Sequence, residues 1–166
     1  IKPINEGSSL DVYICNNKSL LSTKLKKMKN YKEILIEKFI PGREIQVAIM
    51  GNKKLGTIEL VPKRKFYDYK AKYKKSAKTQ HLMPAPISKM KYKEVLKISE
   101  KANRILKCKG IVRCDFRFYK NKFFLLEVNT QPGMTNLSLV PEIARHCNIS
   151  FVKLVEWMVK DSGINR

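Results

Sequence analysis

Residues that bind metals or form disulfides are scarce in this sequence. It contains four cysteines and two histidines, and no two of the cysteines form a CxxC pair. Structural zinc sites need closely spaced cysteine and histidine ligands, so the sequence predicts no zinc site. Free thiols in a reducing compartment are the simplest interpretation of these cysteines, and a cytoplasmic location is therefore expected.

A long hydrophobic run is also missing. The sequence has no stretch of about 18 consecutive apolar residues, which a membrane-spanning helix requires. We therefore expect no membrane partner. Hydrophobic residues still make up 43% of the chain, which is enough for a packed core.

Acidic residues are few, 14 against 35 basic ones, and the formal net charge is +21. Such a charge raises the hypothesis of a basic nucleic-acid-binding module. Seven of the basic residues are arginine, however, and the lysines are spread over the whole chain. Proteins that read bases usually use arginine for its bidentate geometry, whereas a diffuse lysine excess is typical of a solvated surface. Nucleic-acid binding is therefore kept as an alternative and not as the main prediction.

The sequence does contain a series of helix and strand patterns. Helical spacing of apolar residues predicts helices over residues 19–29, 91–107, about 138–147 and 151–161. Apolar or alternating runs predict strands over residues 33–40, 43–50, 54–61, 111–119 and 122–129. Turns at Gly51 and Asn121 would join the last four strands into two hairpins. Residues 62–87 lack clear periodicity and predict a long loop of the kind that is commonly functional. The fold class is therefore α+β with mainly antiparallel pairing.

The second predicted hairpin carries polar side chains on one face. Side chains alternate across a strand, so Glu127 and Asn129 share a face, and Arg113, Asp115 and Arg117 do so on the partner strand. Two carboxylates and an amide oxygen are ligands that Mg²⁺ prefers, and this ion usually shares its shell with substrate phosphates. Glu127 follows an apolar run, so its carboxylate is expected to need a cation or strong hydrogen bonds. The pattern fits a magnesium–phosphate site and scattered surface charges equally well.

A tight loop follows this hairpin. Residues 129–135 read NTQPGMT and contain a glycine directly after a proline. Such a loop can offer backbone N–H groups to an oxyanion. The loop therefore strengthens the interpretation of the hairpin as a phosphate site.

Five segments together resemble the D-alanine–D-alanine ligases, which are members of the ATP-grasp superfamily. LLEVNTQPGMTNLSLVP (125–141) resembles the family's final active-site segment, and GIVRCDF (110–116) resembles the strand before it. KPINEGSS (2–9) resembles its phosphate-contacting strand and small-residue loop, and EKFIPGRE (37–44) its adenine- and ribose-binding edge. FYDYKAKY (66–73) is similar to the mobile loop over its active site. The segments occur in the family's order.

The resemblance implies the C-terminal portion of an ATP-grasp fold, in which an antiparallel sheet is flanked by helices. Residues 1–61 would be part of the nucleotide-binding subdomain, 62–87 an active-site loop and 88–166 a metal- and phosphate-binding subdomain. The chain begins at Ile1 directly on a strand-like stretch. We therefore expect the family's N-terminal substrate domain to be absent from this chain.

The resemblance also implies which residues hold ATP. Lys2 matches a lysine that contacts the phosphates, and Lys72 matches one that reaches the γ-phosphate. Glu44 matches an acid that accepts hydrogen bonds from the ribose. Three further positions match those that hold adenine. The implied nucleotide-binding residues are Lys2, Glu37, Lys38, Ile40, Glu44 and Lys72.

Catalytic roles are implied in the same way. Arg113 and the Gly133 N–H match groups that stabilise the tetrahedral oxyanion. Ser8 matches a loop that closes the substrate side. Tyr73 matches a tyrosine that hydrogen-bonds across the substrate pocket and accompanies D-alanine, not D-lactate, as second substrate. The implied metal ligands are Asp115, Glu127 and Asn129, and the implied pocket for the second alanine ends at Ser138 and Leu139.

The implied reaction joins two D-alanines through an acyl phosphate, for the synthesis of peptidoglycan precursors. ATP and two Mg²⁺ or Mn²⁺ ions would be required. The N-terminal half of the enzyme and a second copy in a homodimer are the implied protein partners, and the isolated chain is expected to be inactive. Another ATP-grasp ligase that joins a carboxylate to an amine is the alternative within the superfamily, and a non-catalytic remnant is the alternative outside it.

Overall fold

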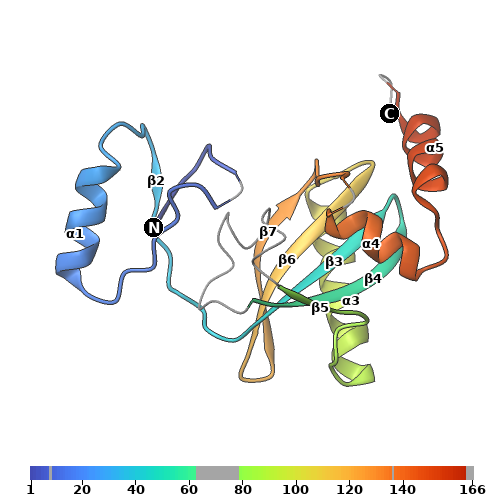
Figure 1. Ribbon diagram of the computed structural model, residues 1–166, viewed down its shortest axis with the longest axis horizontal. Coiled ribbons are helices and arrows are strands. Elements are labelled where there is room, and N and C mark those ends of the chain that lie inside the picture. Colours follow the sequence, from blue (N-terminus) through green and yellow to red (C-terminus); the bar gives the residue numbers. More distant parts are fainter. Residues whose placement is uncertain (8, 63–78, 136, 164–166) are drawn as a thin grey trace. The chain divides into compact units, whose positions relative to one another are not determined.

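The chain forms two compact units, each with its own hydrogen-bonded sheet (Figure 1). The computed structural model describes residues 1–7, 9–62, 79–135 and 137–163. The first unit comprises Ile1–Ile40 and Pro62–Thr79, and the second comprises Pro41–Val61 and Gln80–Arg166. The two units are described separately below.

The first unit combines a short two-stranded sheet with one helix. β1 (Lys2–Pro3) pairs antiparallel with β2 (Ile34–Leu35), and α1 (Lys18–Lys27) lies between them in the sequence. The helix begins at Lys18 because the Asn17 side-chain oxygen accepts a hydrogen bond from the Leu20 N–H at 2.8 Å. The helix predicted over this region is confirmed.

The strand predicted over residues 33–40 is wrong beyond Leu35. β1 offers two residues for pairing, so a longer β2 would have no ladder partner there. Ile36 and Phe39, which made the segment look like a buried strand, are exposed. Apolar composition alone therefore overestimated the length of this strand.

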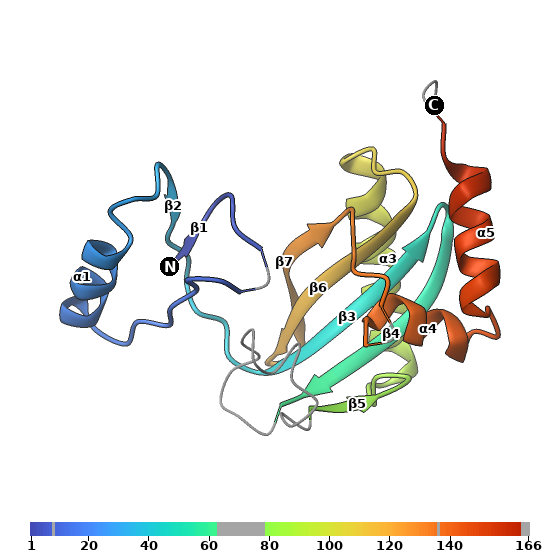
Figure 2. The same cartoon turned by 45° about the horizontal axis from the view of Figure 1, so that its top comes forward.

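The second unit is built on a five-stranded antiparallel sheet with the order β5-β4-β3-β6-β7 (Figures 1 and 2). Its strands are β3 (Arg43–Met50), β4 (Lys53–Val61), β5 (Gln80–Leu82), β6 (Ile111–Tyr119) and β7 (Lys122–Asn129). The four strands and two hairpins predicted in this region are confirmed. The β6–β7 turn places Lys120 and Asn121 at φ 46° and 61°, which suits a two-residue hairpin turn.

β5 lies inside the segment predicted as a loop, so that prediction is wrong at residues 80–82. The strand pairs with β4, Leu82 opposite Glu59 and Gln80 opposite Val61. Three residues are too few to show alternation in a sequence, and it is the pairing that makes them a strand. Residues 63–78 of the predicted loop lie outside the described residues.

The compact units divide the chain after residue 40, so residues 43–61 lie in the second unit. The subdomain boundaries implied by the resemblance remain predictions. β3 pairs with β6 along its whole length, from Arg43 opposite Phe118 to Met50 opposite Ile111. The β3–β4 hairpin therefore belongs to the same sheet as the C-terminal strands. Periodicity indicates where strands are, but it does not show which of them pair.

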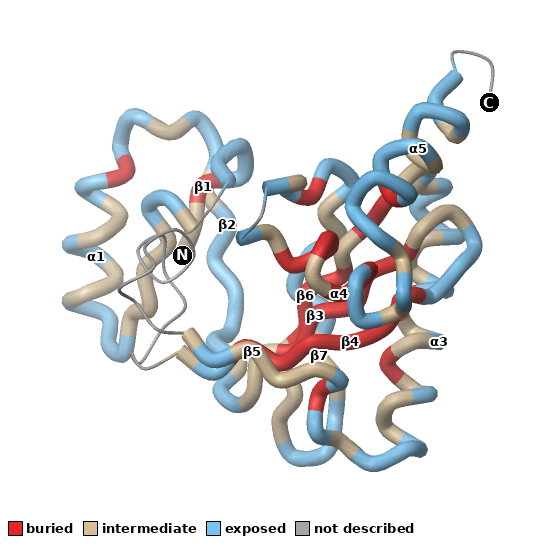
Figure 3. Tube along the Cα trace, turned by 45° about the vertical axis from the view of Figure 1, so that its right-hand side comes forward, coloured by how far each residue is buried: buried red, intermediate tan, exposed pale blue. Residues whose placement is uncertain are grey.

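One face of this sheet packs against α3 (Lys89–Ile105), and the main core lies between them. The fully buried side chains of this core come from β3, β6 and α3, as the buried segments in Figure 3 show. They are Val47, Ile49, Val95, Val112, Cys114 and Phe116. Ile105 and Leu106 are exposed at the end of the helix.

Two further helices close the second unit. α4 (Leu139–His146) contacts β4 and β3. In Figures 1 and 2 it lies in front of the sheet, whereas α3 lies behind the sheet. α5 (Phe151–Asp161) follows, and Ser150 caps it by accepting from the Lys153 N–H. Among the described residues, no helix is long and apolar enough to cross a membrane.

Candidate functional site

The pairing of β6 with β7 brings the predicted metal ligands onto one face of the sheet. Asp115 lies opposite Glu127, and Arg113 lies opposite Asn129. A register shift occurs between Asp115 and Phe116, so one extra residue of β7 is accommodated beside the site. The shared face predicted from strand alternation is therefore confirmed as geometry.

Arg113 and Asp115 form a bidentate ion pair at the centre of this face. Arg113 Nε donates to Asp115 Oδ1 at 2.7 Å, and Arg113 Nη2 donates to Oδ2 at 2.8 Å. The two side chains are 14% and 8% exposed, so the pair is largely shielded from water. Arg113 Nη2 also lies 3.9 Å from Glu127 Oε1. A planar guanidinium held by two parallel bonds has a fixed orientation, which suits recognition of phosphate or carboxylate oxygens.

Glu127 is more exposed than its sequence context predicted. Its side chain is 54% exposed, and the preceding Leu125 and Leu126 are themselves exposed. Burial therefore does not oblige this carboxylate to have a cation or strong hydrogen bonds, as the sequence had predicted. The reason is that this part of β7 is left uncovered, although its composition resembles that of a buried strand.

The donor set nevertheless fits Mg²⁺ or Mn²⁺. An ionised carboxylate offers about four acceptor sites on two oxygens, so Asp115 can bind Arg113 and a cation together. Asn129 Oδ1 accepts from the Gln131 N–H at 2.9 Å and retains a second lone pair. Among the described residues, no group of three or more His, Cys, Asp or Glu side chains could hold a metal. Two carboxylates and an amide would leave room for water and phosphate in the shell, as Mg²⁺ requires.

A second arginine–carboxylate pair lies along the same face. Arg117 and Glu44, the predicted ribose ligand, are register partners, and Arg117 Nη2 lies 3.6 Å from Glu44 Oε2. Arg117 Nη1 also donates to the Gly42 carbonyl at 3.0 Å. The sequence placed Arg117 on this face without a role, and the structure places it within ion-pair distance of Glu44. Strand alternation was the signal available, but the partner strand could not be identified from it.

The loop after β7 is held by hydrogen bonds around Ser138. The Thr135 N–H donates to Ser138 Oγ at 2.9 Å, and the two hydroxyl oxygens are also 2.9 Å apart. A Cβ on Gly133 would lie 2.9 Å from Ser138 Oγ, so glycine allows this close approach. Ser138 is the N-cap residue of α4, and Leu139, its first residue, is buried. The predicted residues Gly133, Ser138 and Leu139 are therefore brought together.

The first unit contains the other predicted nucleotide residues. Lys2 Nζ lies 2.9 Å from Glu37 Oε1, so β1 and the segment after β2 place these two side chains together. Lys38 is exposed and Ile40 is half-buried. The predicted residues Ser8, Lys72 and Tyr73 lie outside the described residues.

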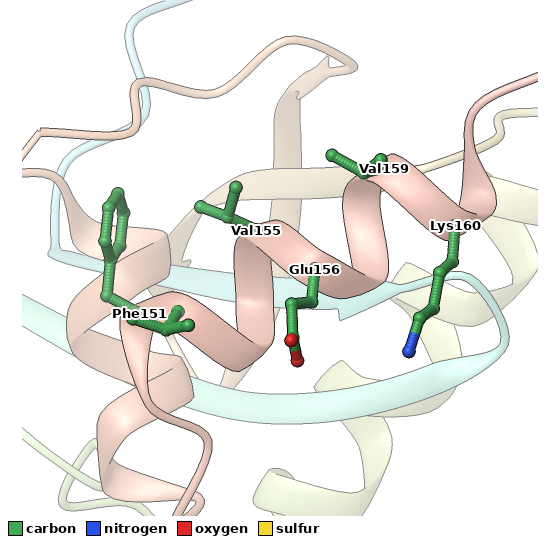
Figure 4. A pocket seen from close by; sticks show the side chains of 6 residues that line it. Phe151, Val155, Glu156, Val159 and Lys160 are labelled. Carbon is green, nitrogen blue, oxygen red and sulfur yellow. The ribbon is translucent and has the colours of Figure 1, made fainter.

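A mainly apolar pocket lies along α5 (Figure 4). It contains none of the predicted site residues. Its lining residues are Phe151, Val152, Val155, Glu156, Val159 and Lys160. Phosphate recognition needs several convergent donors, so this pocket does not suit a nucleotide.

Comparison with known proteins agrees with the geometry. The family model described as "D-ala D-ala ligase C-terminus" matches residues 1–160. The D-alanine–D-alanine ligase of Pelagibacter ubique is 62% identical over 166 residues, which are 100% of this chain and 54% of that protein. The structure of the D-alanine–D-alanine ligase of Bacillus anthracis has a TM-score of 0.83 and 33% identity, covering 96% of this chain and 52% of that one. The structure of that enzyme complexed with ATP has a TM-score of 0.75 and 27% identity, covering 87% and 46%.

The extent of these matches defines what the chain corresponds to. It spans about half the length of the relatives that it matches. The family model covers both compact units, and the antiparallel sheet flanked by helices is that of the ATP-grasp ligases to which these structures belong. The chain therefore belongs to the family of D-alanine–D-alanine ligases and has the fold of their C-terminal, ATP-grasp region.

Proposed function

We propose that this chain provides the metal- and phosphate-binding wall of an ATP-dependent ligase that joins two D-alanines. The observation that carries the proposal is the row formed by Asp115 and Glu127, with Arg113 held in place by Asp115. Membership of the ligase family and the ATP complex of a structural relative support it. Because the chain spans about half of its relatives, the complete activity is a proposal for the protein that carries this region.

The described residues would act mainly by positioning charge. Asp115, Glu127 and Asn129 would hold one or two Mg²⁺ or Mn²⁺ ions, which when bound neutralise phosphate oxygens. Asp115 also orients the Arg113 guanidinium through two hydrogen bonds, so this cation needs little reorganisation to meet a phosphate. Phosphoryl transfer depends on such positioning and charge stabilisation more than on covalent help from the protein.

The proposed reaction has two stages. The carboxylate of the first D-alanine attacks the γ-phosphorus of ATP, which gives an acyl phosphate and ADP. The amine of the second D-alanine then attacks the acyl carbon, loses a proton, and inorganic phosphate leaves. Arg113 and the Gly133 N–H would stabilise the oxyanion of the second stage.

The remaining residues have supporting roles in the proposal. Lys2 would contact the ATP phosphates, while Glu44, positioned by Arg117, would accept hydrogen bonds from the ribose. Ser138 and Leu139 would close the pocket for the carboxylate of the second alanine. The roles of Ser8, Lys72 and Tyr73, the homodimer and the cytoplasmic location remain predictions.

Metal-dependent nucleotide binding is the first test. Titration of the chain with Mn·ATP in a calorimeter is expected to show binding that is lost in Asp115→Ala. A control, Lys54→Ala, changes an exposed lysine paired with Glu100 and should bind as the parent chain does. Binding that is indifferent to Asp115→Ala, but falls steeply with salt and extends to any polyanion, would instead support a basic nucleic-acid-binding module.

Turnover is the second test. The chain joined to the N-terminal half of the Pelagibacter ubique ligase is expected to release phosphate only when D-alanine is present, whereas the chain alone should release none. Comparable D-alanine-dependent release by the chain alone would contradict the need for the other half. Release that depends on a different carboxylate or amine would indicate another ATP-grasp ligase.

A further inference from the structure

Gln46 is a buried polar residue whose presence the proposed reaction does not explain. It lies in the middle of β3, it is 1% exposed, and its Oε1 has no hydrogen-bond partner among the described residues. Buried side-chain oxygens are nearly always hydrogen-bonded, so an acceptor without a donor indicates a missing partner. The question is therefore which partner this oxygen serves.

The sheet register places Gln46 directly beside the candidate metal site. Gln46 is the register partner of Asp115, which is in turn the register partner of Glu127. Residues opposite each other across antiparallel strands have their side chains on one face, with Cβ atoms about 5 Å apart. A row of three oxygen-bearing side chains thus crosses β3, β6 and β7. This row comes from the pairing of β3 with β6, whereas the sequence prediction considered the β6–β7 hairpin alone.

The chemistry of this row selects the missing partner. Gln46 Oε1 and the Asp115 carboxylate are both acceptors, so they cannot satisfy each other. Arg113, the donor at this position, directs Nε and Nη2 to Asp115. A cation, or a donor such as a water bound to a cation, would satisfy both acceptors.

We propose that Gln46 is a positioning residue of the metal site, whose amide oxygen accepts a hydrogen bond from a water in the shell of the Mg²⁺ or Mn²⁺ ion at Asp115. The inference rests on the proposed function, because it needs a cation at Asp115 and Glu127. Gln46 thereby fixes the orientation of that water and extends the site from the β6–β7 hairpin to the centre of the sheet. Loss of such an outer partner typically weakens metal binding by about 10- to 100-fold.

Mn²⁺ binding to the chain in the presence of ATP tests this inference, with free Mn²⁺ followed by its paramagnetic resonance signal. Gln46→Leu keeps a side chain of comparable volume but removes the amide, and it is expected to weaken Mn²⁺ binding by about 10- to 100-fold. Asn103→Leu is the matched control, because Asn103 Oδ1 is also buried and without a hydrogen-bond partner among the described residues. Asn103 lies on α3 and donates to the Gly51 carbonyl, so its replacement should leave Mn²⁺ affinity unchanged.

Thermal unfolding without metal separates positioning from a merely structural role. Removal of an acceptor that lacks a donor is expected to leave the metal-free melting temperature of Gln46→Leu unchanged or higher, although Mn²⁺ binds less tightly. A lower melting temperature with unchanged Mn²⁺ affinity overturns the inference and indicates that Gln46 binds an ordinary buried water.

Asp115→Asn separates failure of the inference from failure of the proposed function. If Asp115→Asn weakens Mn²⁺ binding and Gln46→Leu does not, the inference about Gln46 fails and the metal site stands. If neither variant changes Mn²⁺ affinity, or the parent chain binds no Mn²⁺, the proposed metal site fails as well.

Discussion

Removal of Arg113 is expected to destabilise the second unit as well as to impair the site. Arg113 and Asp115 are 14% and 8% exposed and joined by two hydrogen bonds. Arg113→Met keeps much of the side-chain volume but takes both guanidinium donors away from a shielded carboxylate. Breaking one side of a buried ion pair costs about 3–5 kcal/mol, because the remaining charge is left without compensation.

The loss in the free energy of unfolding can be measured by urea unfolding, and the shift in melting temperature by thermal unfolding, each followed by circular dichroism. A loss of about 3 kcal/mol would lower the melting temperature of a protein of this size by about 6–12 °C. The matched control is Lys54→Met, which breaks the Lys54–Glu100 pair at 2.9 Å. Those side chains are 35% and 52% exposed, so the control is expected to cost less than about 1 kcal/mol.

A double variant provides the refuting result. Arg113→Met combined with Asp115→Leu replaces both charges by apolar groups, and it is expected to recover most of the stability lost in Arg113→Met. A loss below about 1 kcal/mol in the single variant would show that the pair behaves like an exposed one. A double variant no more stable than Arg113→Met would show that the loss does not come from the stranded carboxylate.

Two further predictions concern the loop and the core. Gly133→Ala places a Cβ 2.9 Å from Ser138 Oγ, so it is expected to displace the Thr135–Ser138 hydrogen bonds. The expected result is a loss of about tenfold in kcat/KM of the joined enzyme. An unchanged kcat/KM would mean that the loop tolerates the methyl group. Burial raises the pKa of the fully buried Cys114 thiol to about 11, so alkylation at pH 8 is expected to label Cys114 only after unfolding. Peptide mass analysis would show the labelling, and the half-buried Cys15 is the internal control.

The hairpins were predictable because their information is local. Alternation in residues 43–50 and 111–119 reflects the pleat of a single strand, and the turns at Gly51 and Asn121 lie directly between the strands that they join. β5 was not predictable, since its three residues are a strand only through pairing with β4. β2 ends after Leu35 for the related reason that its partner is equally short.

The candidate site shows the same division. The side chains of Arg113 and Asp115 could be assigned to one face from the sequence, because residues two apart on a strand share a face. Their bidentate pairing depends on rotamers, and the exposure of Glu127 depends on which part of β7 is left uncovered. Neither property is encoded in residue spacing.

The sequence by itself determined the types of residue at the site, their order along the chain and the family that they resemble. Tertiary structure alone decided that β3 lies between β4 and β6, which sets Glu44 against Arg117 and Gln46 against Asp115. The physical reason is that the register between strands distant in sequence is selected by burying Val47, Val112 and their neighbours against α3. The row of the proposed metal site therefore begins as a local hairpin pattern, and packing on the opposite face of the sheet extends it to Gln46.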